Sequence, residues 1–195
     1  NIVVIPALLI SASHAKKEIP NRIIKMSHQF PGLNIKYGRP LGINPKILKV
    51  CLERIEETEK KSISSIARAE TFLITVAHGS NDPGVNLTTA KIPQTLCENM
   101  GFGGFEINFI GKNQPLLSES LEASIKMKFK RVIIFPFFLF NGVLTKRIAS
   151  TVDDIQKQQP EVELLKAQHL NHHELIIDVF MKRAREAPFV LQDTN

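Results

Sequence analysis

Residues 74–84 read ITVAHGSNDPG, an apolar run that ends in one histidine and a cluster of turn-forming residues. Residues 72–77 are mostly β-branched or otherwise apolar, which is typical of a strand buried on both faces of a parallel sheet. Residues 79–84 are rich in Gly, Asn, Asp and Pro and therefore predict a loop. We expect His78 at the carboxyl end of the strand, the edge at which open α/β sheets bind their ligands.

The strand belongs to a sequence that contains an internal repeat. Residues 2–10, IVVIPALLI, align with residues 132–140, VIIFPFFLF, and each segment has four apolar residues on either side of a proline. After one gap the alignment continues, and it pairs Arg54 with Arg183. Each copy reads as strand, helix, strand and helix.

The helices of this pattern are supported by apolar residues at helical spacing. From Leu144, apolar residues recur at i+4, i+8 and i+11, which gives one stripe along a helix. Strands that alternate with such helices imply parallel βαβ units with right-handed crossovers. The sequence therefore predicts an α/β fold of two similar Rossmann-like lobes, each a parallel sheet flanked by helices.

The two copies of the repeat differ in length. Residues 1–60 contain the last strand–helix–strand–helix of the unit, whereas residues 71–188 contain the complete series. The polar residues 61–70 predict a linker between the lobes, and residues 189–195 form a tail. Because the chain starts at Asn1 directly in a strand of the buried type, we expect the first lobe to be an N-terminally incomplete copy.

Composition and charge narrow the class of protein. Hydrophobic residues make up 43% and charged residues 23%, as in ordinary globular proteins, and the nine-residue apolar runs are too short for a bilayer span of roughly 20 residues. Cys51 and Cys97 lie far apart, which favours a reducing cytoplasm over a disulfide framework. The net charge of +6 is spread along the chain without a nucleic-acid motif. It indicates a solvated basic surface or, alternatively, a site for a polyanionic small molecule.

Three motifs carry a resemblance to a known family. Residues 76–83, VAHGSNDP, resemble the HGSxDP strand end of the CbiX-type sirohydrochlorin chelatases. Residues 135–148, FPFFLFNGVLTKRI, resemble their PYFLFTGVLxKRI segment, and residues 5–20, IPALLISASHAKKEIP, are similar to PLLLFAAGHAKNDIP. The combination resembles the long, duplicated form of these class II chelatases.

This resemblance implies two lobes with a macrocycle bound between them, and a reaction. Co²⁺, or Fe²⁺ or Ni²⁺ in some members, is inserted into a carboxylate-rich tetrapyrrole with release of two protons, in cobalamin or sirohaem biosynthesis. The metal is then a substrate, no tightly bound cofactor is expected, and the lack of a P-loop agrees with a reaction without ATP. The alternative is a non-catalytic protein of the same fold that binds tetrapyrrole or cobalt. Association with nucleic acid or a membrane is not expected, and formation of a homodimer stays open.

The resemblance assigns catalysis and metal binding to histidines at two strand ends, His14 and His78. Neutral imidazole is a ligand for Co²⁺ and can also accept a pyrrole proton. The structural alternatives are a loop cap for His78 and a surface position for His14. The second lobe has Leu144 where the first has His14, so His14 belongs to the expected working half. His78 is then either a contributor from the second lobe or a remnant.

Four cations follow the matched strands and open the next helices. They are Lys16, Lys17, Lys146 and Arg147. Cations at a helix N-terminus can hold carboxylates, so we expect these side chains to bind the substrate. For each residue taken singly, a solvated first turn is an equally good interpretation.

A further group of histidines stands in HLNHHE, residues 169–174. Three imidazoles within five residues can bind a stray ion, but a structural metal site needs a fourth ligand. We therefore predict that His173 is the N-cap of the last helix rather than a metal ligand.

Overall fold

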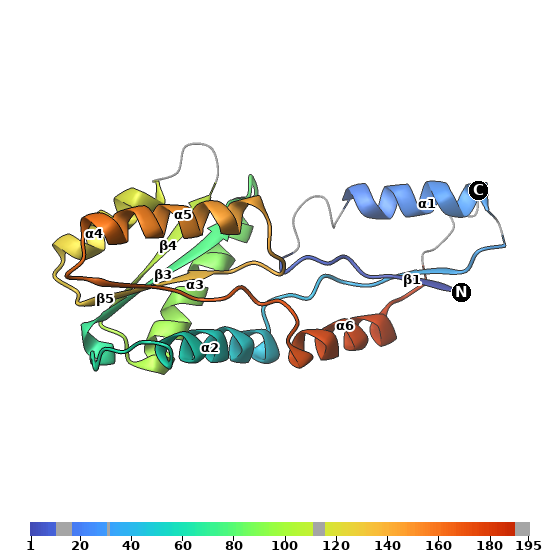
Figure 1. Cartoon of the computed structure of the whole chain (residues 1–195). Coiled ribbons are helices and arrows are strands. Elements are labelled where there is room, and N and C mark those ends of the chain that lie inside the picture. The colour runs from blue at the N-terminus through green and yellow to red at the C-terminus, as the bar shows by residue number, and fades with distance from the viewer. Residues whose placement is uncertain (11–16, 31, 111–115, 190–195) are drawn as a thin grey trace. The chain divides into compact units, whose positions relative to one another are not determined.

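The computed structural model describes residues 1–10, 17–30, 32–110 and 116–189. The chain divides into two compact units (Figure 1). Unit 1 consists of Asn1–Ile47 and His172–Asn195, and unit 2 consists of Leu48–Asn171.

Unit 2 is built on a parallel sheet with the strand order β4-β3-β5-β6. Its strands are β3 (Thr71–His78), β4 (Gly104–Ile110), β5 (Arg131–Pro136) and β6 (Glu163–Lys166). All residues of β5 are buried, and so are the first seven of β3. This confirms the strand predicted from the apolar run and the parallel α/β architecture.

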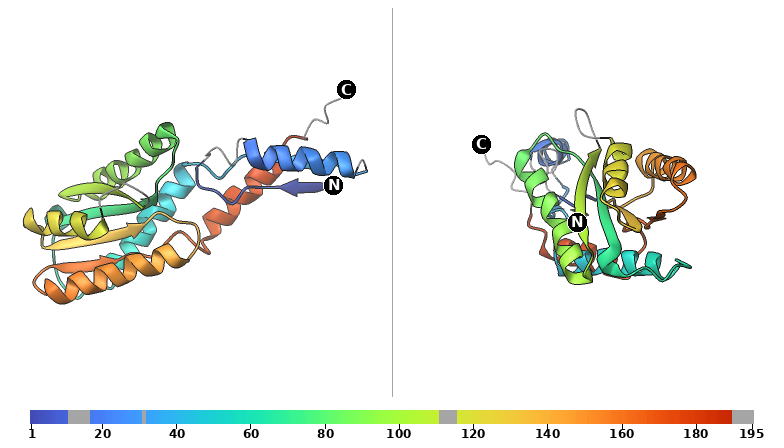
Figure 2. Two further views of the ribbon diagram at one scale, coloured as in Figure 1. Left: turned by 90° about the horizontal axis from the view of Figure 1, so that it is seen from above. Right: turned by 90° about the vertical axis from the view of Figure 1, so that its left-hand side faces the viewer.

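Helices cover both faces of the unit 2 sheet. They are α3 (Pro83–Met100), α4 (Leu117–Lys126), α5 (Val143–Gln158) and most of α2 (Pro45–Glu59). Figures 1 and 2 show α4 and α5 on one face and α2 and α3 on the other. Ile148, Val152 and Ile155 of the predicted stripe are buried against alternate residues of β3 and β5. Within the described part of the chain, no helix is long and apolar enough to cross a membrane.

Unit 1 contains a smaller parallel sheet. Its elements are β1 (Ile2–Val4), α1 (Ile19–Gln29), β2 (Ile35–Tyr37), α6 (Glu174–Glu186) and the start of α2. A strand does begin at Ile2, and it ends at Val4. The prediction that this strand is buried was wrong, because Ile2 is 41% exposed. Among the described residues β1 pairs with β2 alone, whereas its repeat equivalent β5 is flanked by strands on both sides.

Helices α2 and α6 occupy equivalent positions in the two copies of the repeat. Most of α2, from the first half of the sequence, lies in unit 2, whereas α6, from the second half, lies in unit 1. Each of the two helices is held by hydrogen bonds from an arginine to backbone carbonyls. On α6, Arg183 donates hydrogen bonds to the carbonyl oxygens of Pro40 (3.0 Å) and Leu41 (2.8 Å). On α2, the repeat partner Arg54 donates to the Asn171 carbonyl (2.7 Å). The predicted halves 1–60 and 71–188 therefore describe the duplication of the sequence. The compact units have different bounds, because α2 packs in unit 2 and α6 packs in unit 1.

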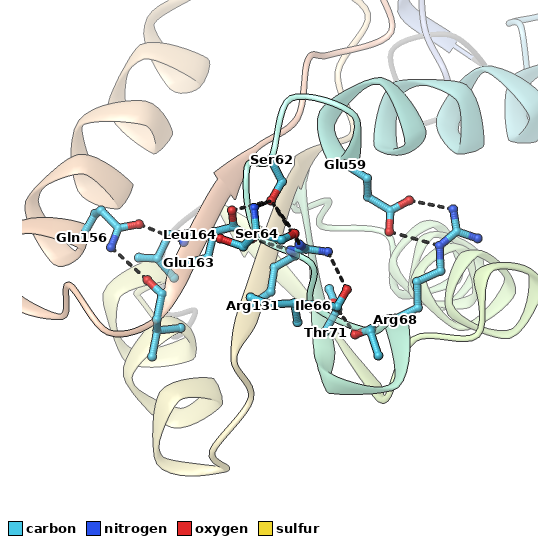
Figure 3. A network of polar contacts seen from close by, with 12 residues as sticks. Glu59, Ser62, Ser64, Ile66, Arg68, Thr71, Arg131, Gln156, Glu163 and Leu164 are labelled. Carbon is cyan, nitrogen blue, oxygen red and sulfur yellow. Dashed lines mark hydrogen bonds and ion pairs between the residues drawn. The ribbon is translucent and has the colours of Figure 1, made fainter.

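The predicted linker belongs to unit 2, where the guanidinium of Arg131 holds it (Figure 3). Arg131 is 4% exposed. Its Nε donates to Glu163 (2.6 Å), Nη2 to the Ser62 hydroxyl (3.1 Å) and the Ser64 carbonyl (2.9 Å), and Nη1 to the Ile66 carbonyl (3.2 Å). We call these five residues the Arg131 network. Residues 62–66 still connect the two sequence halves, but they are held at the amino edge of the sheet instead of forming a free tether.

Candidate functional site

The candidate site lies at the carboxyl edge of the unit 2 sheet. The parallel strands β3, β4 and β5 all end there, with His78 opposite Ile110 and Val76 opposite Pro136. The seven residues of β3 that precede His78 are buried, whereas His78 itself is exposed. The structure thus places His78 where the sequence predicted it, at the edge of an open α/β sheet that binds ligands.

The loop after His78 is short and tightly held. The Gly79 N–H continues the strand ladder by donating to the Ile110 carbonyl (3.3 Å). The Asp82 carboxylate accepts from the Gly84 N–H (3.0 Å) and caps α3, whose first residue is Pro83. Asp82 and a proline at the first helical position are both favourable at a helix start. The loop therefore forms a firm support for the imidazole of His78.

The imidazole of His78 has a defined hydrogen bond. Its Nδ1 lies 2.8 Å from the Gly79 carbonyl oxygen, which can only accept. Nδ1 must therefore carry the proton in this contact, which leaves the lone pair on Nε2. Metal-binding histidines commonly donate their second ring N–H to a carbonyl in this way. The loop contact expected from a purely structural histidine is present, and it leaves Nε2 available to bind a metal or accept a proton.

Few other side chains at this edge could bind a metal ion together with His78. No group of three or more His, Cys, Asp or Glu side chains within the described ranges could hold a metal ion. In unit 2, His78 therefore offers one imidazole nitrogen instead of a closed coordination cage. A single imidazole ligand suits an ion that has to be released to a substrate, because closed four-ligand sites belong to structural metals.

Two predicted cations share this edge with His78. Helix α5 begins at Val143, after the loop that follows β5, and Lys146 and Arg147 are exposed near its N-terminus. Neither side chain forms an ion pair with any residue that the structure describes. The first turn also presents backbone N–H groups, which favour anions. The carboxyl edge of unit 2 thus combines an imidazole with two cations and a helix N-terminus.

The other predicted site residues fall into separate places. Lys17 is exposed in a π-helical turn that leads into α1 of unit 1. His14 and Lys16 lie outside the described residues. The prediction for His173 is confirmed, because it is the N-cap of α6 and its Nδ1 accepts a hydrogen bond from the Leu175 N–H (3.2 Å).

One residue near the site was missed by the sequence analysis. The side chain of Asn86, on the first turn of α3, makes two hydrogen bonds to the backbone of Ser80 in the loop. An asparagine six positions after a serine carries no signal by itself, because the contact depends on how the loop folds back onto the helix.

Comparison with known protein families gives a match over most of the chain. The CbiX family model covers residues 1–58 and 72–187. The chain belongs to the CbiX family. This confirms the resemblance inferred from the motifs, and the unmatched residues 59–71 include the segment held by the Arg131 network.

Two proteins from Priestia megaterium are similar to this chain. The chain is 32% identical over 186 residues to a sirohydrochlorin cobaltochelatase, covering 95% of this chain and 60% of the relative. It is 28% identical over 173 residues to a sirohydrochlorin ferrochelatase, covering 89% of this chain and 62% of that relative. The chain thus spans about three fifths of the length of these relatives.

A solved structure agrees with the fold. The crystal structure of the sirohydrochlorin chelatase SirB from Bacillus subtilis subspecies spizizenii, in complex with cobalt, matches with a TM-score of 0.70 and 25% sequence identity. The match covers 94% of this chain and 68% of that one. It confirms the predicted α/β architecture.

Proposed function

We propose that this CbiX-family protein is a sirohydrochlorin chelatase, which inserts a divalent metal ion into a carboxylate-rich tetrapyrrole without ATP. The observation that carries the proposal is His78, an exposed imidazole at the carboxyl edge of the sheet whose Nδ1–H is held by Gly79 and whose Nε2 is left as the acceptor. The named relatives act on sirohydrochlorin, which supports the choice of substrate.

Insertion replaces two pyrrole protons by one divalent cation. The ion becomes bound to the four ring nitrogens while two N–H bonds break and two protons leave, so the reaction requires both a weak metal ligand and a proton acceptor. A neutral imidazole has one free lone pair and cannot perform both tasks at the same time. We therefore assign both roles, metal ligand and proton acceptor, to His78 and, from the family resemblance, also to His14, which lies outside the described residues. Each is a metal ligand or a general base according to the step.

Binding of the substrate carboxylates is assigned to the cations that open the helices. Lys146 and Arg147 stand exposed at the N-terminus of α5, where charge-assisted hydrogen bonds to carboxylates form without breaking an ion pair to a described residue. Lys16 and Lys17 are assigned the same role before α1. Free, buried Cys51 and Cys97 support a cytoplasmic location.

The metal proposed for the first experiments is Co²⁺. Imidazole binds both Fe²⁺ and Co²⁺, with the higher affinity for Co²⁺. One of the named relatives is a cobaltochelatase and the other a ferrochelatase. Parallel assays with Fe²⁺ under anaerobic conditions measure the preference.

The proposal is tested by mixing the chain with sirohydrochlorin and Co²⁺ and following the absorbance of the metallated product. We expect acceleration over a control without protein. Because acid–base catalysis contributes roughly 100-fold or more, His78→Ala should reduce kcat/KM by about that factor. The matched control is Lys130→Ala at the opposite edge, which should keep the wild-type rate. Binding of sirohydrochlorin without acceleration would establish the non-catalytic alternative, and the absence of both would refute the proposal.

A further inference from the structure

The hydrogen bonds of Asn86 lead to the ring of His78 through a single peptide group. Asn86 is half-buried on α3, and its Oδ1 accepts from the Ser80 N–H (2.9 Å) while its Nδ2 donates to the Ser80 carbonyl (2.8 Å). The two bonds hold the backbone of Ser80 from both sides, and they connect the loop to a helix of 18 residues.

The Ser80 N–H and the Gly79 carbonyl belong to the same peptide group. A trans peptide is planar, and its N–H and C=O point in opposite directions. When Asn86 holds the N–H on one side, the carbonyl on the other side is fixed as well. That carbonyl oxygen is the atom that lies 2.8 Å from Nδ1 of His78. The orientation of this peptide therefore decides whether the imidazole has an acceptor for its Nδ1 proton.

The peptide needs such an anchor because it follows a glycine. Gly79 has more backbone freedom than any other residue type, and a Cβ at this position would make ordinary contacts of 3.5 Å with Phe109. Close packing around Gly79 thus does not by itself fix the peptide. If the anchor is lost, the carbonyl can rotate away from the imidazole, and Nε2 competes with Nδ1 for the proton.

We propose that Asn86 is a positioning residue that sets the tautomer of His78, with the proton on Nδ1 and the lone pair on Nε2. Its effect on the tautomer follows from the geometry of residues 78–86 alone. Its effect on metal insertion rests on the proposed function. Asn86 does not touch the ion or the macrocycle in this scheme; it acts through the Gly79–Ser80 peptide.

The tautomer is measured by ¹⁵N NMR of the full chain labelled at histidine, at about pH 8, where a typical imidazole is neutral. The ring signals of His78 are assigned by their loss in His78→Gln. We expect the Nδ1–H tautomer in the wild type and a mixture of tautomers in Asn86→Ala. Asn86→Asp keeps the acceptor for the Ser80 N–H but loses the donor to the Ser80 carbonyl, so it should restore the Nδ1–H form in part. The matched control is Thr88→Ala on the same helix, since the Thr88 hydroxyl bonds to the Gly84 carbonyl of α3.

Activity provides the second readout. Loss of an outer-shell partner typically lowers activity 10–100-fold, so Asn86→Ala should reduce kcat by roughly that factor, with Asn86→Asp recovering part of it. A His78 that stays in the Nδ1–H form in Asn86→Ala overturns the inference. If Asn86→Ala does not fold, the wild-type spectrum decides, because a predominant Nε2–H tautomer there also overturns it. A mixed tautomer in Asn86→Ala without chelatase activity in the wild type supports the inference and refutes the proposed function.

Discussion

At the amino edge of the unit 2 sheet, Arg131 is 4% exposed, and all three of its side-chain nitrogens donate hydrogen bonds (Figure 3). At the carboxyl edge of the same sheet, His78, Lys146 and Arg147 are exposed, and neither cation is paired with a described residue. A charge that is buried has to be paired, or it destabilises the fold. The charge at the amino edge is buried and paired, whereas the charges at the carboxyl edge are exposed and not paired with a described residue.

The division between the edges has a physical basis in the strands themselves. β3 and β5 are buried along almost their whole length, so side chains that need water or a ligand can be presented at the ends of the strands. At the amino end, the chain that leads into β3 folds back onto Arg131 and satisfies it. At the carboxyl end, the loop satisfies its own backbone through Asp82 and Asn86 and leaves the imidazole exposed.

The largest effect on stability is expected at the amino edge. Arg131→Ala removes the partner of the Glu163 carboxylate, whose side chain is 18% exposed, and should lower the free energy of unfolding by about 3–5 kcal/mol. Its neighbour Lys130 pairs with Glu70 in an exposed position (64% and 43% exposed), so Lys130→Ala should cost at most about 1 kcal/mol. Urea denaturation measures both values. Equal losses in the two variants would contradict the assignment of a stabilising amino edge.

A smaller effect, on binding instead of stability, is expected at the carboxyl edge. Replacing Lys146 and Arg147 by Ala should raise the KM for sirohydrochlorin by about tenfold or more, since a hydrogen bond to a charged group contributes about 1.5–3 kcal/mol. The free energy of unfolding should change by less than about 0.5 kcal/mol, as for other surface substitutions. Lys157→Ala, at the other end of α5 and paired with exposed Asp154, is the control. A KM that rises equally in the control would show that general charge, and not this edge, binds the substrate.

The smallest effect concerns the pH dependence of stability. Burial raises the pKa of Glu163, but hydrogen bonds from Ser62 and Arg131 outweigh it, so the net pKa is lowered. A lowered pKa in the folded state contributes stability that is present above the usual glutamate value of about 4.3 and is lost as pH falls through the folded pKa. In Glu163→Gln, the free energy of unfolding should therefore fall less steeply as the pH drops below about 4.3. Urea denaturation midpoints at several pH values measure this change. A variant whose acid limb is as steep as that of the wild type would contradict this.

Local patterns predicted much of the carboxyl edge. The apolar run before His78 and the turn residues after it are neighbours in sequence, so the end of the strand could be placed from them alone. The helical stripe that includes Ile148 was predicted for the same reason. The CbiX resemblance supplied the chemistry, because an isolated histidine at a strand end does not indicate a tetrapyrrole or a metal.

The features that the sequence did not predict depend on distant partners. Arg131 bonds to residues 62–66, which lie 65–69 positions earlier in the chain, whereas the polarity of that segment indicated only a linker between the two halves. The exchange of α2 and α6 between compact units is likewise invisible in a repeat, since both helices show the same pattern wherever they pack. β1 is exposed because, among the described residues, only one strand lies beside it, and the residues of β1 alone do not reveal how many strands flank it.

A titration with Co²⁺ monitored by NMR tests whether Nε2 of His78 binds the metal, as we propose. Paramagnetic Co²⁺ broadens the ring signals of any histidine that binds it, so each imidazole of the chain reports separately. We expect the signals of His78 to broaden at the lowest Co²⁺ concentrations, while those of His172 and His173 persist. Broadening of His172 and His173 with sharp signals from His78 would contradict it.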